Sequence, residues 1–190
     1  MGSPSMVPTG VLHEADDRTL VAAFLEHRRE AFDVIVERHW RTVYHLCYRF
    51  VGNHEDASDL AQDVFVRAFK GLHKFKGDSS LATWLHRVGV NVCLNRVAIK
   101  PPPCKPIGEM ERRDDRIEDP LAQLVRGERA AIVRAAIRKL PSKQRATLVL
   151  RVYQELTHEE IARILGRSVG TGKANFFNAL GNLRRLLQSA

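Results

Sequence analysis

Basic and amide side chains gather near the end of the chain, where they could contact nucleic acid. Residues 126–190 carry 13 lysines and arginines against 4 acidic residues, whereas residues 1–100 carry 13 against 12. Lysine neutralises phosphate, and asparagine hydrogen-bonds the edge of adenine. Lys173, Asn175 and Asn178 supply both groups within six positions. The chemistry indicated is therefore binding of duplex DNA, with a basic surface that only meets solvent as the alternative.

The residues around this group predict two short helices joined by a tight turn. Thr157 and Glu160 have the spacing of a capping box at the start of the first helix. Gly166 can end that helix in the left-handed conformation, and Ser168 can cap the next one. Two helices joined by a short turn that contains glycine are typical of a helix-turn-helix, whose second helix enters the major groove. A helical hairpin buried in a bundle is the alternative from this stretch alone.

A second group of candidate nucleic-acid ligands lies between residues 74 and 95. Lys74 and Lys76 flank Phe75, and a helix predicted to begin near Ser80 follows them. Aromatic rings stack on unpaired bases while basic groups follow the backbone, so this stretch could hold single-stranded nucleic acid. The alternative is that the aromatic residues are core and that the lysines merely solvate a loop.

The histidines and cysteines do not converge on a catalytic or metal site. The eight histidines are scattered. Cys47 and Cys93 fall on apolar helix faces and are interpreted as small buried residues, whereas Cys104 lies in a proline-rich stretch with little scope for redox chemistry. We therefore expect no catalytic residue, no metal ligand, no cofactor and no small-molecule substrate, and a protein that is not an enzyme.

No apolar run is long enough to span a bilayer, and the first residues lack the hydrophobic segment of a secretory signal. The expectation is a cytoplasmic protein without membrane insertion.

Helical periodicity extends through most of the remaining chain and predicts an all-α fold. Four prolines and few apolar residues make residues 100–119 a flexible linker between two small helical domains, of which the C-terminal one holds the helix-turn-helix. The predicted boundaries are a disordered N-terminus at 1–14, a helical domain at 15–99, the linker at 100–119 and a second helical domain at 120–190.

Two long segments carry a family resemblance. Region 2 of the extracytoplasmic-function (ECF) sigma factors of bacterial RNA polymerase resembles AFDVIVERHWRTVYHLCYRFVGNHEDASDLAQDVFVRAFKGLHKFKGDSSLATWLHRVGVN, and region 4 resembles LPSKQRATLVLRVYQELTHEEIARILGRSVGTGKANFFNALGNLRR. The resemblance implies a sigma factor that binds core polymerase through the β′ clamp helices and the β flap, and that directs promoter recognition and opening. It also implies an anti-sigma factor as a partner. The alternative is a stand-alone helix-turn-helix regulator of operator DNA, but such a regulator needs no half that binds single strands.

The resemblance gives roles to three sets of residues. The set implied to bind polymerase is Asp59, Gln62, Asp63, Phe65 and Arg67. The set implied to hold the melted minus-ten element is Lys74, Phe75, Lys76, Asp78, Ser79, Ser80, Trp84, Arg87, Asn91 and Asn95. The set implied to read the minus-thirty-five duplex is Arg167, Ser168, Thr171, Lys173, Ala174, Asn175, Phe177, Asn178 and Arg184.

The second helix of the helix-turn-helix departs from the usual family pattern, S-V-G-T-V-K-S-R-L-x-R-A. Gly172 replaces an apolar residue, and Asn175 and Asn178 stand where arginines are common. Arginine favours guanine, whereas asparagine favours adenine. The sequence therefore predicts a minus-thirty-five preference unlike the usual family consensus.

Overall fold

The computed structural model describes residues 9–99 and 120–189, and these residues form helices without a β-strand among them. The prediction of an all-α fold is confirmed. In chain order the elements are α1 (Thr9–Glu14), α2 (Asp17–Leu25), α3 (Glu30–Val51), α4 (His54–Gly71), the 3-10 helix η1 (Leu72–Lys74), α5 (Leu81–Ile99), α6 (Pro120–Lys139), α7 (Ser142–Val152), α8 (His158–Leu165) and α9 (Val169–Gln188). The predicted linker at 100–119 lies outside the described residues.

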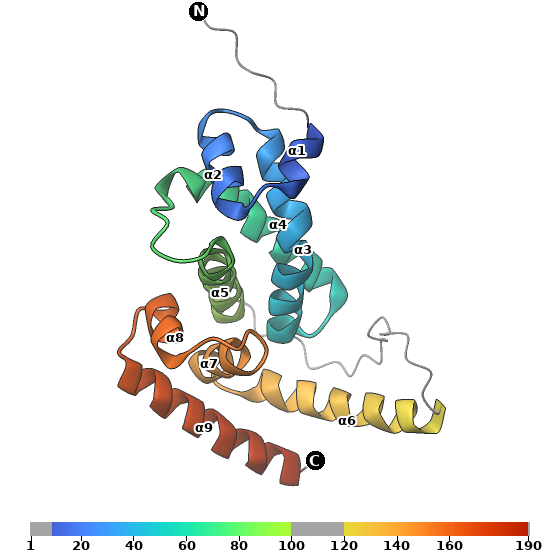
Figure 1. Cartoon of the computed structure of the whole chain (residues 1–190). Helices are drawn as coiled ribbons and strands as arrows, with labels where there is room; N and C mark the ends of the chain where they lie inside the picture. Colours follow the sequence, from blue (N-terminus) through green and yellow to red (C-terminus); the bar gives the residue numbers. More distant parts are fainter. Residues whose placement is uncertain (1–8, 100–119, 190) are drawn as a thin grey trace, which may run out of the picture.

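Helices α1 to α5 form an N-terminal module in which α3, α4 and α5 pack on one another (Figure 1). Their shared core includes the fully buried side chains of Leu46, Val64 and Leu85. Gly89 lets α5 approach α3 closely, because a Cβ atom at that position would lie 2.8 Å from Leu46 Cδ2. The core thus fixes α4 and α5, the two helices that flank the candidate single-strand site.

The start of the chain differs from the prediction of a disordered segment at 1–14. Residues 1–8 lie outside the described part, but Thr9–Glu14 form α1. Leu12 is 3% exposed, and Arg38 donates hydrogen bonds to the carbonyl oxygens of His13 (3.2 Å) and Ala15 (2.7 Å). Composition alone did not reveal these tertiary contacts, which hold a short, otherwise marginal helix in place.

Helices α6 to α9 form a C-terminal module that ends in the predicted helix-turn-helix. The Thr157 hydroxyl accepts a hydrogen bond from the Glu160 amide, and the Glu160 carboxylate accepts one from the Thr157 amide, so the capping box is confirmed. Gly166 ends α8 with a φ of 60°, and Ser168 caps α9. The turn between the two helices therefore forms as the sequence predicted.

The apolar residues along α9 are only partly buried. Gly172 and Ala179 are its buried positions, whereas Leu180 is 41% exposed and Leu187 is 36% exposed. Helix α9, whose 20 residues span about 30 Å, packs on α6, α7 and α8 and leaves these two leucines accessible to solvent.

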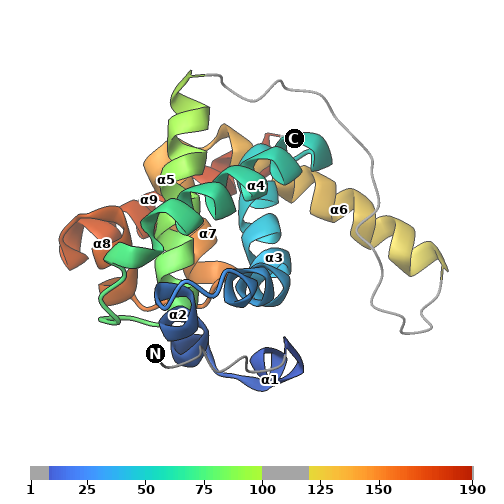
Figure 2. The same ribbon diagram turned by 90° about the horizontal axis from the view of Figure 1, so that it is seen from above.

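The two modules pack against each other through α3 and α5 on one side and α6, α7 and α8 on the other (Figures 1 and 2). Arg145 is 3% exposed, and its Nη1 donates to the Phe50 carbonyl oxygen at 2.9 Å. Arg138 Nη1 lies 3.4 Å from the Gly52 carbonyl oxygen, so two guanidinium groups meet the C-terminal end of α3, where a helix dipole favours cations. We call these contacts, together with the guanidinium of Arg49 4.1 Å above the Tyr153 ring, the interdomain clasp.

Candidate nucleic-acid and polymerase interfaces

The residues predicted to read duplex DNA lie at the start and along one side of α9. The Ser168 hydroxyl accepts from the Thr171 amide at 3.2 Å and lies 2.9 Å from the Thr171 hydroxyl, so these two residues set the helix start. Asn175 is half-buried. The exposed members of the set are Arg167, Ser168, Thr171, Lys173, Ala174, Phe177, Asn178 and Arg184.

The ring of Phe176 packs between α8 and the exposed side of α9 that carries these residues. The Phe176 ring meets the His158 ring of α8 edge-on at 5.7 Å, and it meets the Phe177 ring at 6.1 Å. Phe177 itself is 67% exposed, more than any other large apolar residue in the described ranges. An exposed phenyl ring on a reading helix can contact a thymine methyl group. The face is thus suited to bases with adenine and thymine edges.

Gly172 lies on the opposite, buried side of α9, and replacing it by alanine is expected to stabilise the protein. A Cβ atom there would lie 3.9 Å from the His158 carbonyl oxygen, an ordinary contact distance. We expect Gly172→Ala to raise the free energy of unfolding in urea by about 1 kcal/mol. Gly181→Ala is the matched control, because that exposed position of α9 has open space around it. If Gly172→Ala lowered the free energy of unfolding while Gly181→Ala raised it, the space around residue 172 would be tighter than the structure indicates.

The residues predicted to hold single-stranded DNA divide between a loop and one face of α5. Phe75 and Trp84 are both half-buried, and their rings meet at 5.6 Å with an interplanar angle of 57°. Each ring packs on the core and keeps part of its surface accessible, so the core interpretation holds in part and the ligand role stays a prediction. Lys74, Lys76, Asp78, Ser80, Arg87, Asn91 and Asn95 are exposed, and Ser79 is half-buried.

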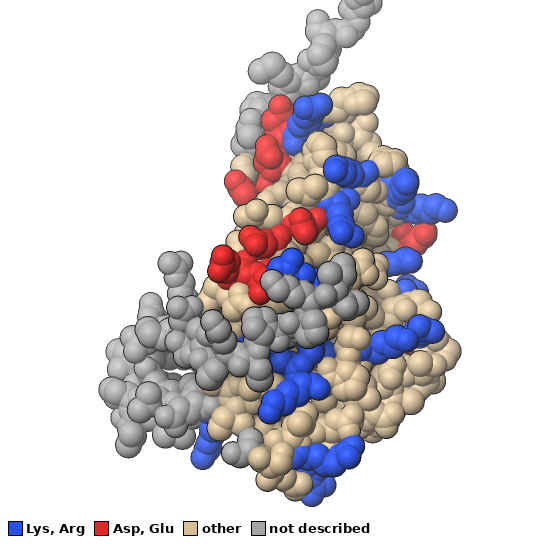
Figure 3. Space-filling model, turned by 180° about the vertical axis from the view of Figure 1, so that it is seen from behind, with Lys and Arg blue, Asp and Glu red and all other residues tan. Residues whose placement is uncertain are grey.

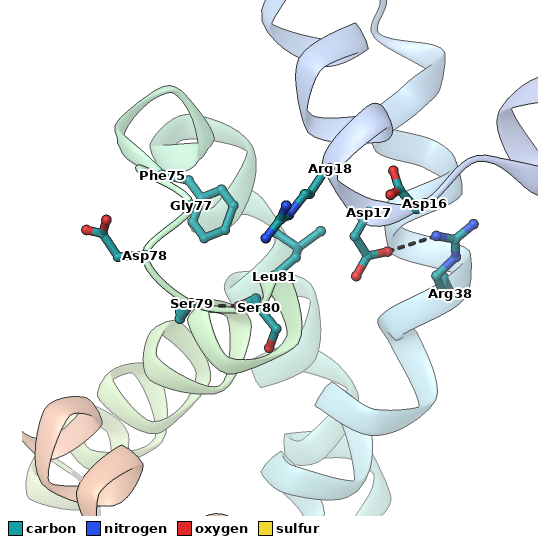
Figure 4. Close-up of a pocket in the computed structure, with 10 residues that line it drawn as sticks. All are labelled: Asp16, Asp17, Arg18, Arg38, Phe75, Gly77, Asp78, Ser79, Ser80 and Leu81. Carbon is teal, nitrogen blue, oxygen red and sulfur yellow. Dashed lines mark hydrogen bonds and ion pairs between the residues drawn. The ribbon is translucent and has the colours of Figure 1, made fainter.

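A cavity of about 630 Å³ lies beside this loop, between α2 and the start of α5 (Figure 4). It brings together Phe75, Asp78, Ser79 and Ser80 of the predicted set. The remaining members, on α5 and at the lysines of the loop, do not line it. The other lining residues are Asp16, Asp17, Arg18, Arg38, Gly77 and Leu81. Sequence reasoning missed the wall from α2 and α3, because nothing in the spacing links those residues to a loop some 40 to 60 positions away.

The charged groups of this wall are mostly engaged with one another. Arg38 Nη1 donates to Asp17 Oδ1 at 2.8 Å, and His39 Nε2 lies 3.0 Å from Asp17 Oδ2. Asp16 caps α2 by accepting from the Thr19 amide at 2.8 Å, and hydrogen bonds from Thr19 lower the pKa of its carboxyl. The charges of the wall are therefore largely neutralised.

The predicted polymerase-binding residues lie on α4, and all but one face solvent. Asp59, Gln62, Asp63 and Arg67 are exposed. Phe65 is 5% exposed and stacks on Trp40 with centroids 5.8 Å apart, so its burial does not fit a docking side chain. Two other apolar residues of α4 are exposed instead, Val66 at 52% and Phe69 at 40%. The sequence analysis did not single them out. Val66 follows Phe65 directly, and this step of one residue around the helix turns its side chain from the core to solvent.

Acidic side chains are confined to part of one face of the molecule. Figure 3 shows them in the upper half of that face, beside lysines and arginines, whereas the coloured charged groups in its lower half, over the C-terminal helices, are lysine and arginine. Within the described ranges, no helix has the length and apolar composition to cross a membrane. The same residues contain no group of three or more histidine, cysteine or acidic side chains placed to hold a metal ion.

Comparisons with known proteins agree with both modules. Residues 35–98 match the family Sigma-70 region 2, and residues 130–183 match Sigma-70, region 4. The chain is 31% identical over 189 residues to the RNA polymerase sigma-H factor of Pseudomonas aeruginosa, covering 94% of this chain and 97% of that protein. It is 36% identical over 179 residues to the ECF RNA polymerase sigma factor SigM of Mycobacterium tuberculosis, covering 94% and 88%.

Two solved structures share the fold. CnrH, in a complex with the cytosolic domain of CnrY, matches with a TM-score of 0.66 and 26% identity over 91% of this chain and 97% of its own. RpoE of Bartonella quintana, in a complex with the anti-sigma factor NepR, matches in fold with a TM-score of 0.63 and 19% identity, covering 83% and 96%. With the helix-turn-helix, the basic C-terminal module and the single-strand candidate site in place, the chain belongs to the ECF sigma factors, which direct transcription initiation by bacterial RNA polymerase.

Proposed function

We propose that this sigma factor holds a promoter at two separate elements, one with each module. The observation that carries the proposal is that the two modules present unlike surfaces, exposed basic and amide side chains on α9 and a cavity beside the Phe75 ring. The exposed side of α9 suits the major groove of a minus-thirty-five duplex. The cavity beside Phe75 suits an unstacked base of the melted minus-ten element. Polymerase docks on the acidic face of α4 through its β′ clamp helices, and on the C-terminal module through its β flap.

Holding both elements requires the two modules to separate. A compact chain of 190 residues has a radius of gyration of about 16 Å. The elements lie about 25 base pairs apart, which is roughly 85 Å at 3.4 Å per base pair. The packed arrangement cannot span that distance. We infer that it is the free form, and that the interdomain clasp opens on polymerase.

Breaking one contact of the clasp is expected to favour the open form. Arg49 lies over the Tyr153 ring, and such a contact is worth about 0.5–2 kcal/mol, so Arg49→Ala should raise the open-to-closed ratio by roughly 2- to 30-fold. Single-molecule energy transfer between dyes at the exposed Glu14 and Gln188 measures that ratio. A double-mutant cycle with Tyr153→Ala isolates the ring contact, and Tyr153→Phe is the conservative control. Unchanged transfer efficiency in Arg49→Ala would contradict this role.

A gel-shift assay distinguishes the proposed sigma-factor function from that of a stand-alone regulator. The free protein is expected to bind duplex promoter DNA weakly or not at all, because one helix buries little surface, and to bind tightly once core polymerase is added. Tight, sequence-specific binding by the free protein, unchanged by core polymerase, would favour the regulator.

We propose further that a protein anti-sigma factor keeps the chain inactive. The support is that CnrH is in a complex with the cytosolic domain of CnrY, that RpoE is in a complex with the anti-sigma factor NepR, and that α4 exposes apolar Val66 and Phe69. A pull-down under non-inducing conditions tests the idea, and recovery of polymerase subunits alone would count against it.

We assign no catalytic role to the chain, and place its action in the cytoplasm with core polymerase.

A further inference from the structure

The cavity beside the Phe75 loop has one wall made of residues outside the predicted single-strand set. Helix α2 supplies that wall, and α2 ends at Leu25, ten positions before the Sigma-70 region 2 match begins at residue 35. The cavity is open to solvent, and its volume of about 630 Å³ lies within the range of small-ligand sites. An unstacked base needs surfaces against both of its faces.

Most polar groups that line the cavity already have a structural partner. Asp17 is bound by Arg38, Asp16 caps α2, and the Ser80 hydroxyl accepts from the Thr83 amide at 3.1 Å. Arg18 differs from them. It is exposed, its charge helps to lower the pKa of the Asp16 carboxyl, and Figure 4 shows its side chain extending from α2 toward the loop that carries Phe75. Arg18 is thus the lining cation placed to meet an incoming ligand.

The charges of the cavity favour a base over a phosphate group. Its lining holds three acidic residues, Asp16, Asp17 and Asp78, against two arginines, Arg18 and Arg38. Arg38 is neutralised by Asp17, so an additional anion would meet a net negative site. A nucleobase is uncharged, and its flat faces stack on aromatic rings and on guanidinium planes. The phosphates fit better outside, along exposed Lys74, Lys76 and Arg87.

We propose that Arg18 completes the pocket for the unstacked minus-ten base, with its guanidinium stacked on the face opposite the Phe75 ring. The inference rests on the proposed function, because it concerns the same melted strand. It adds a base-contacting residue from α2, and it makes the N-terminal helices part of the promoter-opening site. Arg18 supplies a flat cation on one side of the base and Phe75 a flat apolar ring on the other.

The variants for the test separate stacking from simple charge. Arg18→Ala removes both, whereas Arg18→Lys keeps the charge and loses the planar group. Stacking predicts that both variants, as holoenzyme, lower the equilibrium constant for promoter opening by about tenfold, within the range measured for loss of one base-stacking partner. Arg41→Ala, an equal loss of charge at an exposed position of α3, is the control and should leave opening unchanged. Wild-type opening in Arg18→Lys would overturn the proposal in favour of charge alone.

Promoters with a single abasic site, moved along the non-template strand of the minus-ten element, complete the test. At the captured position, removing the base should weaken opening by the wild-type holoenzyme. Arg18→Ala should then cause no further loss on that template. An equal loss from Arg18→Ala on intact and abasic DNA would overturn the proposal, because it would mean that Arg18 contacts the backbone. Failure of the proposed function looks different: the wild-type holoenzyme would open no promoter on any template.

Discussion

Replacing His86 by leucine is expected to make the protein more stable in mild acid and to flatten its pH dependence. His86 is 6% exposed on α5, and neither ring nitrogen has a hydrogen-bond partner. Burial, with a smaller contribution from His39, lowers its pKa to about 4. The folded protein therefore holds His86 neutral, whereas the unfolded chain protonates it near pH 6.5.

The sign of the effect follows from proton binding. Between pH 6.5 and pH 4 the unfolded state binds more protons than the folded state, so wild-type stability is present at neutral pH and falls as the pH falls. His86 alone should account for a loss of roughly 2 kcal/mol between pH 7 and pH 5. Leucine has no such titration, and it leaves no buried polar atom without a partner.

Urea unfolding at pH 7, 6 and 5 measures the difference between wild type and His86→Leu. Carboxylates titrate in both proteins, so the difference between their slopes isolates His86. His73→Leu, at an exposed position of η1, is the matched control and should retain the wild-type slope. A His86→Leu slope equal to that of wild type would contradict the buried neutral state.

Reversing two charges on α4 is expected to abolish assembly with core polymerase. Asp59 and Asp63 are exposed, lie one helical turn apart and belong to the proposed docking face. Asp59→Arg with Asp63→Arg would place like charges across that interface, which costs several kcal/mol, so we expect affinity for core polymerase to fall at least about 100-fold.

The matched control uses the same spacing on another helix. Asp33→Arg with Glu37→Arg makes the same change in net charge at exposed, one-turn-spaced positions of α3. Competition for core polymerase measures both variants, and thermal unfolding verifies that each is folded. Equal losses from the two pairs would mean that net charge, and not the α4 face, governs assembly.

Local structural features that depend on single residues could be predicted from the sequence. The capping box of Thr157 and Glu160, the left-handed Gly166 and the cap at Ser168 each depend on neighbours within four positions. The burial of Cys47 and Cys93 followed from helical periodicity and is confirmed. These features need no knowledge of the distant chain.

Features that depend on contacts between distant segments could not be predicted. The helix α1 forms where disorder was expected, because Arg38 binds the carbonyl oxygens of His13 and Ala15. The α2 wall of the cavity and the clasp of Arg145 on Phe50 join residues far apart in the chain. Phe65 is a different case. Helical periodicity places its side chain on the inward side of α4, but the role in polymerase binding that the family resemblance implies conflicts with this burial.

Transcription by purified core polymerase on a library of random promoters, with this protein as the added sigma factor, tests the central claim most directly. Sequencing the transcribed templates should show two elements at a fixed spacing of about two and a half turns, since B-DNA repeats about every 10 base pairs. The upstream element should depart from the usual family consensus, as Asn175 and Asn178 predict. Recovery of the ordinary consensus would contradict the proposed reading by α9, and transcription that needs no upstream element would contradict two-element recognition itself.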